Sequence, residues 1–408
     1  MFQKPVGLNL ICVLCYFITA VHAEDWLARR GPTSSGVSRE SEWAVHWPDS
    51  GPSIRWRAKV GIGFSSITTQ GNRLFTIGNI DDQESIHCLD IQSGQTIWQH
   101  TYECAIDDRF FEGGPTSTPT IDGDRVYALN RQGDLICCST VTGEVVWSKN
   151  VAEATSARIP GWGFSSSPVI VNDHLLLGIG EAGLLLNKAD GEVIWQSGDG
   201  EAGYMTPHVL QIDSRAHALI ASGKFYQCVD LESGEVKWKQ RWLTTYGCNA
   251  ADPIVVQNRA FISSGYGRGA AVLEFNDADV KVVWSNKDMQ NQLNSSVLVD
   301  GFVFGFDGNE GAEVWLKCLE FATGKVTWSY PGLGAGSLMA AGGKLIVLSE
   351  SGELLIANAS STEFIPTARA KVLDGKCWTV PVLSNQSIYC RNAAGDLVCV
   401  DVQLVKVE

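Results

Sequence analysis

The sequence predicts an all-β protein, an eight-bladed β-propeller whose blades are four-stranded antiparallel sheets. The main observation is that Trp recurs seven times, at intervals of 42 to 49 residues. The seven positions are Trp56, Trp98, Trp147, Trp195, Trp238, Trp284 and Trp328. Two further observations support the fold, namely a Gly at a fixed distance before most of these Trp residues and a second turn earlier in each repeat. A period of this length in a chain of short β-rich segments is typical of a radial array of small sheets.

The Trp residues share a common hairpin, in which Gly stands four residues before Trp. The glycines are Gly94, Gly143, Gly191, Gly234 and Gly324. Gly after Ser, Thr or Asp is typical of a turn, because Gly adopts a positive φ without a steric clash. The flanking segments, such as 85–89 and 144–147, are rich in strand-forming residues. We therefore expect a hairpin between the last two strands of each repeat, with Trp filling the space between neighbouring repeats.

An earlier hairpin in each repeat supplies two more strands. Residues 117–121 turn at Asp122-Gly123 into 124–129, and residues 169–171 turn at Asn172-Asp173 into 174–177. Four strands per repeat make one propeller blade.

Counting the repeats gives eight blades. We expect them at about 64–98, 115–147, 164–195, 204–238, 248–284, 293–328, 336–373 and 377–401. The eighth segment holds only three strands, and residues 54–58 offer the fourth from the other end of the chain. Closing the ring with this N-terminal strand removes exposed sheet edges. Two blades are degenerate, since Val280 replaces the turn Gly of the fifth and the seventh lacks the Trp.

The N-terminal residues indicate export. Residues 1–23 have a charged start at Lys4, a mostly apolar stretch from Leu8 to Val21 and small residues before a cleavage position after Ala23. We expect a signal peptide at 1–23, an extension at 24–51, and the propeller at 52–408. The mature protein would be a monomer in the periplasm or cell envelope, without a membrane span. Its net charge of −15 excludes an electrostatic site for nucleic acid.

The cysteines follow the repeat. Five of the twelve share one repeat position in the third strand, namely Cys88, Cys137, Cys228, Cys318 and Cys399. A small buried apolar side chain suits that position, so we interpret them as free thiols. Cys390 and Cys399 flank a turn, and a disulfide between them remains an alternative. The adjacent Cys137 and Cys138 are interpreted as two buried thiols, because neighbouring strand residues point to opposite faces.

Five hairpins that end in Gly-x-x-x-Trp give the chain a family resemblance. It resembles the PQQ-repeat propeller superfamily over nearly all of its mature length. That superfamily includes quinoprotein alcohol dehydrogenases, which bind pyrroloquinoline quinone and Ca²⁺, and BamB-like scaffolds of outer-membrane assembly, which bind no cofactor. The segment 26–36, with Arg30-Gly31-Pro32, is most similar to exported bacterial proteins labelled polyvinyl alcohol dehydrogenase-like.

The resemblance implies specific residues for a dehydrogenase. Its calcium site needs oxygen ligands from a Glu and an Asn, and Glu181 in the Gly-rich loop 178–183 is the best candidate for the Glu. The family's catalytic Asp follows a Thr-Pro-His segment, but here Val209 follows the corresponding 206–208. Asp213 is the nearest acid in sequence. No counterpart of the Asn segment lies between these two motifs.

A ligand would sit at the mouth of the axial channel, where the innermost strands begin. Crowding explains the small residues at these positions, but it does not explain the aromatic ones. The candidates for stacking on a planar cofactor or a sugar are Trp162, Tyr204, Tyr246 and Trp378, and Asn249 and Asn294 offer oxygen atoms to a cation. We also expect the long segment 102–114 to form a loop over one face.

Two functional hypotheses follow. The favoured one is an exported, non-catalytic scaffold that binds a protein or envelope partner at its rim, without a cofactor. The alternative is an oxidoreductase that acts on alcohols with pyrroloquinoline quinone and Ca²⁺ at a divergent site.

Overall fold

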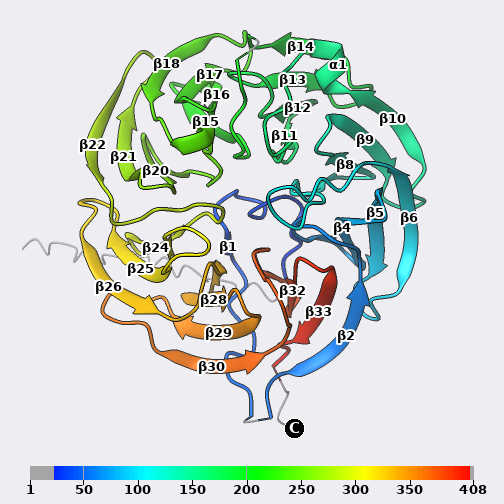
Figure 1. Cartoon of the computed structure of the whole chain (residues 1–408), viewed down its shortest axis with the longest axis vertical. Helices are drawn as coiled ribbons and strands as arrows, with labels where there is room; N and C mark the ends of the chain where they lie inside the picture. The colour runs from blue at the N-terminus through cyan, green and yellow to red at the C-terminus, as the bar shows by residue number, and fades with distance from the viewer. Residues whose placement is uncertain (1–22, 49, 199, 405–408) are drawn as a thin grey trace, which may run out of the picture.

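The computed structural model describes residues 23–48, 50–198 and 200–404, so the predicted signal peptide lies outside the described residues except for Ala23. Eight antiparallel four-stranded sheets surround a central axis, as the sequence predicts (Figure 1). In each sheet the first strand lies nearest the axis and the fourth forms the rim (Figure 1). Among the described residues no helix has the length and apolarity needed to cross a membrane.

The blades follow one another along the chain. Blades 1 and 2 contain β3 (Thr68–Gln70), β4 (Arg73–Ile80), β5 (Gln83–Asp90) and β6 (Thr96–Glu103), then β7 (Thr120–Asp122), β8 (Arg125–Leu129), β9 (Asp134–Ser139) and β10 (Val145–Asn150). The short helix α1 (Val151–Thr155) precedes blade 3, formed by β11 (Val169–Val171), β12 (His174–Leu177), β13 (Leu184–Asn187) and β14 (Val193–Gln196). Blade 4 contains β15 (His208–Ile212), β16 (Arg215–Ala221), β17 (Phe225–Asp230) and β18 (Val236–Arg241).

The second half of the ring repeats this order. After the 3₁₀ turn η1 (Thr245–Gly247), blade 5 contains β19 (Ile254–Val256), β20 (Arg259–Ser264), β21 (Gly269–Phe275) and β22 (Val280–Asn286). Blade 6 contains β23 (Val297–Val299), β24 (Phe302–Asp307), β25 (Trp315–Glu320) and β26 (Val326–Pro331). Blade 7 contains β27 (Ser337–Ala341), β28 (Lys344–Leu348), β29 (Glu353–Asn358) and β30 (Pro366–Lys371).

Blade 8 closes the ring. Its inner strands are β31 (Val382–Ser384), β32 (Ser387–Arg391) and β33 (Asp396–Asp401), and its outer strand is the N-terminal β2 (Ser53–Lys59). β2 pairs antiparallel with β33, as predicted. The buried guanidinium of Arg391 reinforces this closure, because it donates to the carbonyls of Gly61, Ser65 and Ile77 of blade 1. The two ends of the propeller are therefore joined by a sheet ladder and by a buried cation.

The recurring Trp joins each blade to the next one. The Nε1–H of Trp98 donates to the carbonyl of Thr140 in blade 2, at 3.1 Å. A Cβ added to the turn glycine Gly143 would lie 2.6 Å from the Trp98 ring. All seven Trp residues donate to the following blade in this way. Five of the seven Trp residues also pack on the turn glycine of the next repeat, namely Trp56, Trp98, Trp147, Trp195 and Trp284.

A β-bulge recurs where the third and fourth strands of each blade pair. The register shifts there in all eight blades. In blade 1 the shift leaves Ile97 unpaired between Thr96 and Trp98, and its side chain is exposed. A bulge bends the strand and changes the direction of the next side chain. We attribute to it the rotation of each Trp toward the neighbouring blade.

The repeated cysteines face the Trp residues across this bulge. Cys88 lies opposite Trp98, and the four other members of the set lie opposite the Trp of their own blade. All ten cysteines in the described part of the chain are buried and free. The alternative of a Cys390–Cys399 disulfide is therefore wrong. Cys390 pairs with Val398, the neighbour of Cys399, so the two side chains point to opposite faces of the sheet.

The N-terminal extension crosses the axis before it reaches the rim (Figure 1). Trp26 exchanges hydrogen bonds with Thr69 of β3, and Arg29 reaches Asp252 next to β19. The strand β1 (Val37–Ser38) then adds to β27 of blade 7 in parallel orientation. The carboxylate of Glu40 accepts backbone N–H groups at the β31–β32 turn of blade 8. The extension thus contacts inner strands on several sides of the ring and fills part of the channel.

Candidate functional site

A cavity of about 690 Å³ opens where the inner strands begin. Seven of the eight blades contribute to its wall through residues that precede their inner strands or lie in nearby loops. The side chains that carry the argument are Arg29, Phe64, Phe110, Trp162, Tyr204, Tyr246, Tyr266, Asn294, Glu310 and Trp378. The cavity has the size and mostly apolar wall of a small-ligand or side-chain binding site.

One side of the wall is a group of rings that meet edge to face. Trp162 lies 5.5 Å from Tyr204 and 6.0 Å from Tyr246, with interplanar angles of 70° and 80°. Tyr246 in turn meets Tyr266 at 5.6 Å and 86°. Phe110 approaches Trp162 from the loop before β7, at 6.0 Å and 62°. Edge-to-face contacts hold aromatic rings in fixed orientations, so this side of the wall is preorganised.

The other side of the wall is a stacked pair. Phe64 and Trp378 lie 5.4 Å apart with an interplanar angle of 27°, and Phe111 packs against Phe64. The indole N–H of Trp378 donates to the carboxylate of Glu350 at 3.1 Å. The ammonium of Lys376 lies 4.1 Å from the centroid of the Trp378 ring. These contacts fix the orientation of the Trp378 ring.

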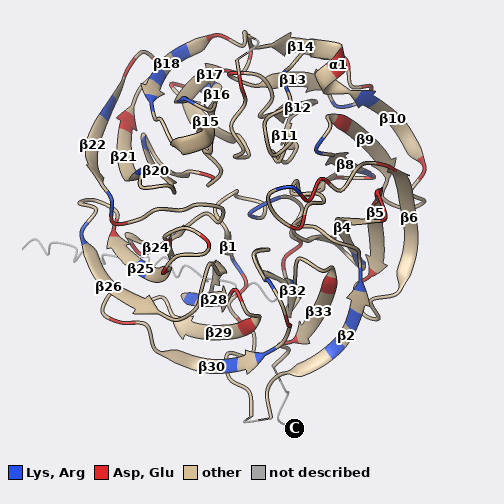
Figure 2. Cartoon of the chain, in the orientation of Figure 1, with Lys and Arg blue, Asp and Glu red and all other residues tan. Residues whose placement is uncertain are grey.

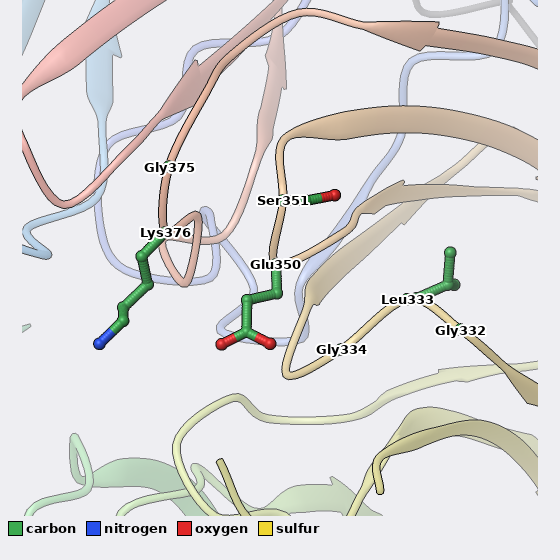
Figure 3. Close-up of a pocket in the computed structure, with 7 residues that line it drawn as sticks. All are labelled: Gly332, Leu333, Gly334, Glu350, Ser351, Gly375 and Lys376. Atoms are coloured by element: carbon green, nitrogen blue, oxygen red, sulfur yellow. The ribbon is translucent and has the colours of Figure 1, made fainter. Parts of the chain in front are cut away.

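A shallow pocket of about 360 Å³ is lined by Glu350 and Lys376, which also contact Trp378 (Figure 3). Figure 3 shows the Glu350 and Lys376 side chains extending from two neighbouring loops. Glu350 also accepts a hydrogen bond from the backbone N–H of Ala335, and Lys376 pairs with Glu112 at 2.8 Å. Because both charged groups are already engaged, we interpret this pocket as support for the larger cavity.

The extension contributes a cation to the cavity. Arg29 lines it, and its Nε donates to Asp252 at 2.8 Å. The other Asp252 oxygen accepts the backbone N–H of Thr206, so the carboxylate is fixed between blades 4 and 5. Arg29 is therefore a paired cation that anchors the extension beneath the cavity.

Burial raises the pKa of a thiol and two phenols in the cavity wall, so these groups stay protonated at neutral pH. Burial raises the pKa of the Cys248 thiol to about 12. Burial also raises the pKa of the Tyr204 and Tyr266 phenols. A thiol and phenols that stay protonated at neutral pH are poor nucleophiles and poor bases. These three groups can donate hydrogen bonds, but they do not provide an activated reacting atom.

The structure brings together five of the six residues predicted at the channel mouth. Trp162, Tyr204, Tyr246, Asn294 and Trp378 all line the cavity. The expectation for Asn249 is not supported, because its side chain is fully buried and its amide bonds to Ser222, Trp242 and Ser264. Its oxygen is therefore committed to the protein itself.

Several cavity residues were not predicted as site residues. Phe110 lies on the loop that was expected over one face, and its aromatic character was a usable signal. Tyr266 lies in the β20–β21 turn and Arg29 in the extension. Nothing local in the sequence distinguishes these two from ordinary loop residues, because only the closed ring brings them to the axis.

The residues proposed for a quinone and calcium site lie apart. Glu181 does not line the cavity, and its carboxylate pairs with Lys239 of the adjacent blade at 3.1 Å. Asp213 lies in the turn at the far end of β15, one strand length away from the mouth. Within residues 23–48, 50–198 and 200–404, no group of three or more His, Cys, Asp or Glu is arranged to hold a metal ion. Calcium needs six to eight oxygen ligands, so the donors at this cavity do not fit the predicted site.

Comparison with known proteins gives the family context. The family described as "Outer membrane protein assembly factor BamB" matches residues 82–330, which is more than half of the chain. The BamB of Yersinia pestis is 25% identical over 235 residues, covering 52% of this chain and 55% of that protein. The quinoprotein alcohol dehydrogenase PedH of Pseudomonas putida is 28% identical over 129 residues, covering 29% of this chain and 21% of that protein. The matches thus span about half and about a fifth of these relatives.

Solved structures share the fold at low identity. BamB from Moraxella catarrhalis superposes with a TM-score of 0.62 and 16% identity, covering 86% of this chain and all of that one. The quinohemoprotein alcohol dehydrogenase from Comamonas testosteroni gives a TM-score of 0.69 and 11% identity, covering 96% of this chain and 82% of that one. At such identities the likeness concerns the propeller fold alone.

Proposed function

The chain belongs to the family described as outer membrane protein assembly factor BamB, and from this premise we propose that it is an exported, non-catalytic binding scaffold. Its partner would be a protein of the cell envelope that docks over the aromatic cavity. The proposal concerns this chain's own surface, because the curated relatives match over only part of their length.

One observation carries the proposal. Two large aromatic side chains stand in solvent at the cavity mouth, Phe110 with 64% and Tyr246 with 69% of its surface exposed. Ile159 and Leu243 are also exposed, in the loops that lead to Trp162 and Tyr246. Exposed apolar groups around a concave site are typical of protein interfaces, where aromatic residues carry much of the binding energy.

The backbone at Tyr246 supports the same conclusion. Tyr246 has a φ of +66°, in the left-handed region that a bulky residue occupies only at an energetic cost. Neighbouring contacts hold it there, since the ring meets both Trp162 and Tyr266. Because the ring is exposed and already held in one orientation, a partner that binds it would lose less conformational entropy on docking.

The alternative is an alcohol-oxidising enzyme that uses pyrroloquinoline quinone and Ca²⁺. The 28% identity to PedH over 129 residues is the finding that favours it. The acidic groups described above do not fit a calcium site at the cavity, and we therefore place this function second.

Site-specific photo-crosslinking tests the scaffold proposal. A photoreactive amino acid at position 110 or 246, in the full chain expressed in its native envelope, should give a discrete protein adduct. The control is position 365, because Ile365 is 58% exposed but lies on blade 7 between β29 and β30. Adducts at all three positions, or at none, would contradict docking at the cavity.

A quinone titration tests the alternative in the same preparation. Tryptophan fluorescence is followed while pyrroloquinoline quinone is added with and without Ca²⁺. We expect no calcium-dependent quenching. Saturable quenching at micromolar quinone that requires Ca²⁺ would establish the enzyme hypothesis in place of the scaffold.

A further inference from the structure

The exposed side of the cavity holds a cluster that suits one particular kind of side chain. The cluster, called here the cation cage, consists of Trp162, Tyr246 and Tyr266 together with the carboxylate of Glu310. All four line the cavity. Trp162 meets Tyr246, and Tyr246 meets Tyr266, at interplanar angles of 80° and 86°. Successive perpendicular rings form the walls of a cage, and such aromatic cages bind ammonium and guanidinium groups through the ring faces.

Glu310 is held at the edge of this cage by a short chain of hydrogen bonds. The backbone N–H of Glu310 donates to the side-chain oxygen of Gln292. The Gln292 amide nitrogen donates in turn to the Tyr266 hydroxyl, at 3.2 Å. The loop that carries the acid, between β24 and β25, is therefore tied to one ring of the cage.

The charges around the cage favour a cation. Glu310 has no ion-pair partner among the described residues, whereas Arg29 is already paired with Asp252, and Lys376 with Glu112. Partial burial raises the pKa of the Glu310 carboxyl, the ammonium of Lys376 lowers it, and the carboxylates of Glu112 and Glu350 raise it. Acidic residues occupy the loops before β7 and between β24 and β25 (Figure 2). A partner's cation placed beside Glu310 would add to the attraction of Lys376 and favour the charged carboxylate.

We propose that the cation cage receives a Lys or Arg side chain of the envelope protein that docks at the cavity, with Glu310 as its counter-ion. This inference rests on the proposed function. The basic group would lie in the cavity beside Trp162, Tyr246 and Glu310, while apolar parts of the partner cover Phe110.

Short peptides test the inference directly. Calorimetric titration of the intact mature protein with Ac-Gly-Arg-Gly-NH₂ and Ac-Gly-Lys-Gly-NH₂ should show binding at least tenfold stronger than with Ac-Gly-Gln-Gly-NH₂. Glu310→Gln should weaken binding of the basic peptides roughly tenfold, the scale of one cation–π or ionic contact. The matched control is Glu313→Gln, which removes the same charge from the same loop outside the cavity and should leave binding unchanged.

A ring deletion completes the design. Tyr246→Asn removes the ring while retaining a residue that tolerates positive φ, and it should also weaken the basic peptides about tenfold. Equal binding of the Gln peptide, or equal effects of the two glutamate variants, would overturn the inference. Tight binding of tetramethylammonium with no binding of the basic peptides would show that the cage serves a small quaternary ammonium ligand instead. A discrete crosslinked partner together with no cation binding would leave the scaffold proposal standing and remove only this inference.

Discussion

The contact between each Trp and the turn glycine of the next blade predicts a large cost for a single methyl group. At Gly143 the backbone has a φ of +76°, and an added Cβ would lie 2.6 Å from two ring atoms of Trp98. Gly123 is a matched control in the same blade, with a φ of +58° and nothing within 4 Å of the added Cβ. Both substitutions to Ala incur the left-handed penalty, about 1–2 kcal/mol. Only Gly143→Ala adds overpacking, about 1–3 kcal/mol.

We therefore expect Gly143→Ala to lower the free energy of unfolding by about 2–5 kcal/mol and Gly123→Ala by about 1–2 kcal/mol. Urea unfolding, followed by tryptophan fluorescence and by circular dichroism, measures both. Repeating the comparison in a Trp98→Leu background should shrink the difference, because the smaller side chain leaves room for the methyl group. Equal losses for the two glycine variants would refute the idea that the Trp ring restricts this turn. An undiminished difference in the Trp98→Leu background would refute it as well.

Three further predictions concern buried polar groups. Burial raises the pKa of the Glu84 carboxyl from 4.5 to about 7, so the native state retains a proton there that the unfolded chain releases. The free energy of unfolding should thus fall by roughly 3 kcal/mol as the pH rises from about 4.5 to about 7. The Glu84→Gln variant should lose this part of the pH dependence when urea midpoints are measured across that range. An unchanged dependence of the midpoint on pH would contradict the assignment to Glu84. Arg391→Met should lower the free energy of unfolding by about 3 kcal/mol or more, because buried carbonyls lose their donor. In the same unfolding assay Arg109→Met should cost much less, because the Arg109 side chain is exposed. Glu40→Gln weakens the acceptor for two backbone N–H groups of blade 8 and should make the extension more sensitive to limited proteolysis; unaltered cleavage would show that the carboxylate is not its anchor.

The blades could be read from the sequence because the information for each one is local. Turn glycines, strand-forming residues and a Trp at fixed spacing recur in most repeats, and they predicted the strand count and the closing role of β2. The degenerate fifth and seventh repeats still form blades, since neighbouring sheets and the hairpin turns define them without the missing consensus residue. The cysteine set was also readable, because one repeat position meets the same environment in each blade.

The candidate site could be read only in part. The predicted aromatic residues Trp162, Tyr204, Tyr246 and Trp378 line the cavity, because the propeller brings the starts of its inner strands close to the axis. The two predicted asparagines have different environments, which their own segments do not reveal. The side chain of Asn249 bonds to three neighbouring groups, whereas Asn294 lines the cavity. Glu181 looked like a ligand from its Gly-rich loop, yet Lys239 of the next blade pairs with it.

The sequence by itself determined the architecture, and the tertiary structure decided which side chains meet. Seven blades are formed by strands that follow one another in the chain, and their turns and Trp residues leave a periodic trace. The cavity joins residues from Arg29 to Trp378, and no periodicity links positions so distant in sequence. Their proximity depends on ring closure, on the path of the extension across the axis and on the bulges that turn each Trp toward its neighbour, and all three are properties of the assembled propeller.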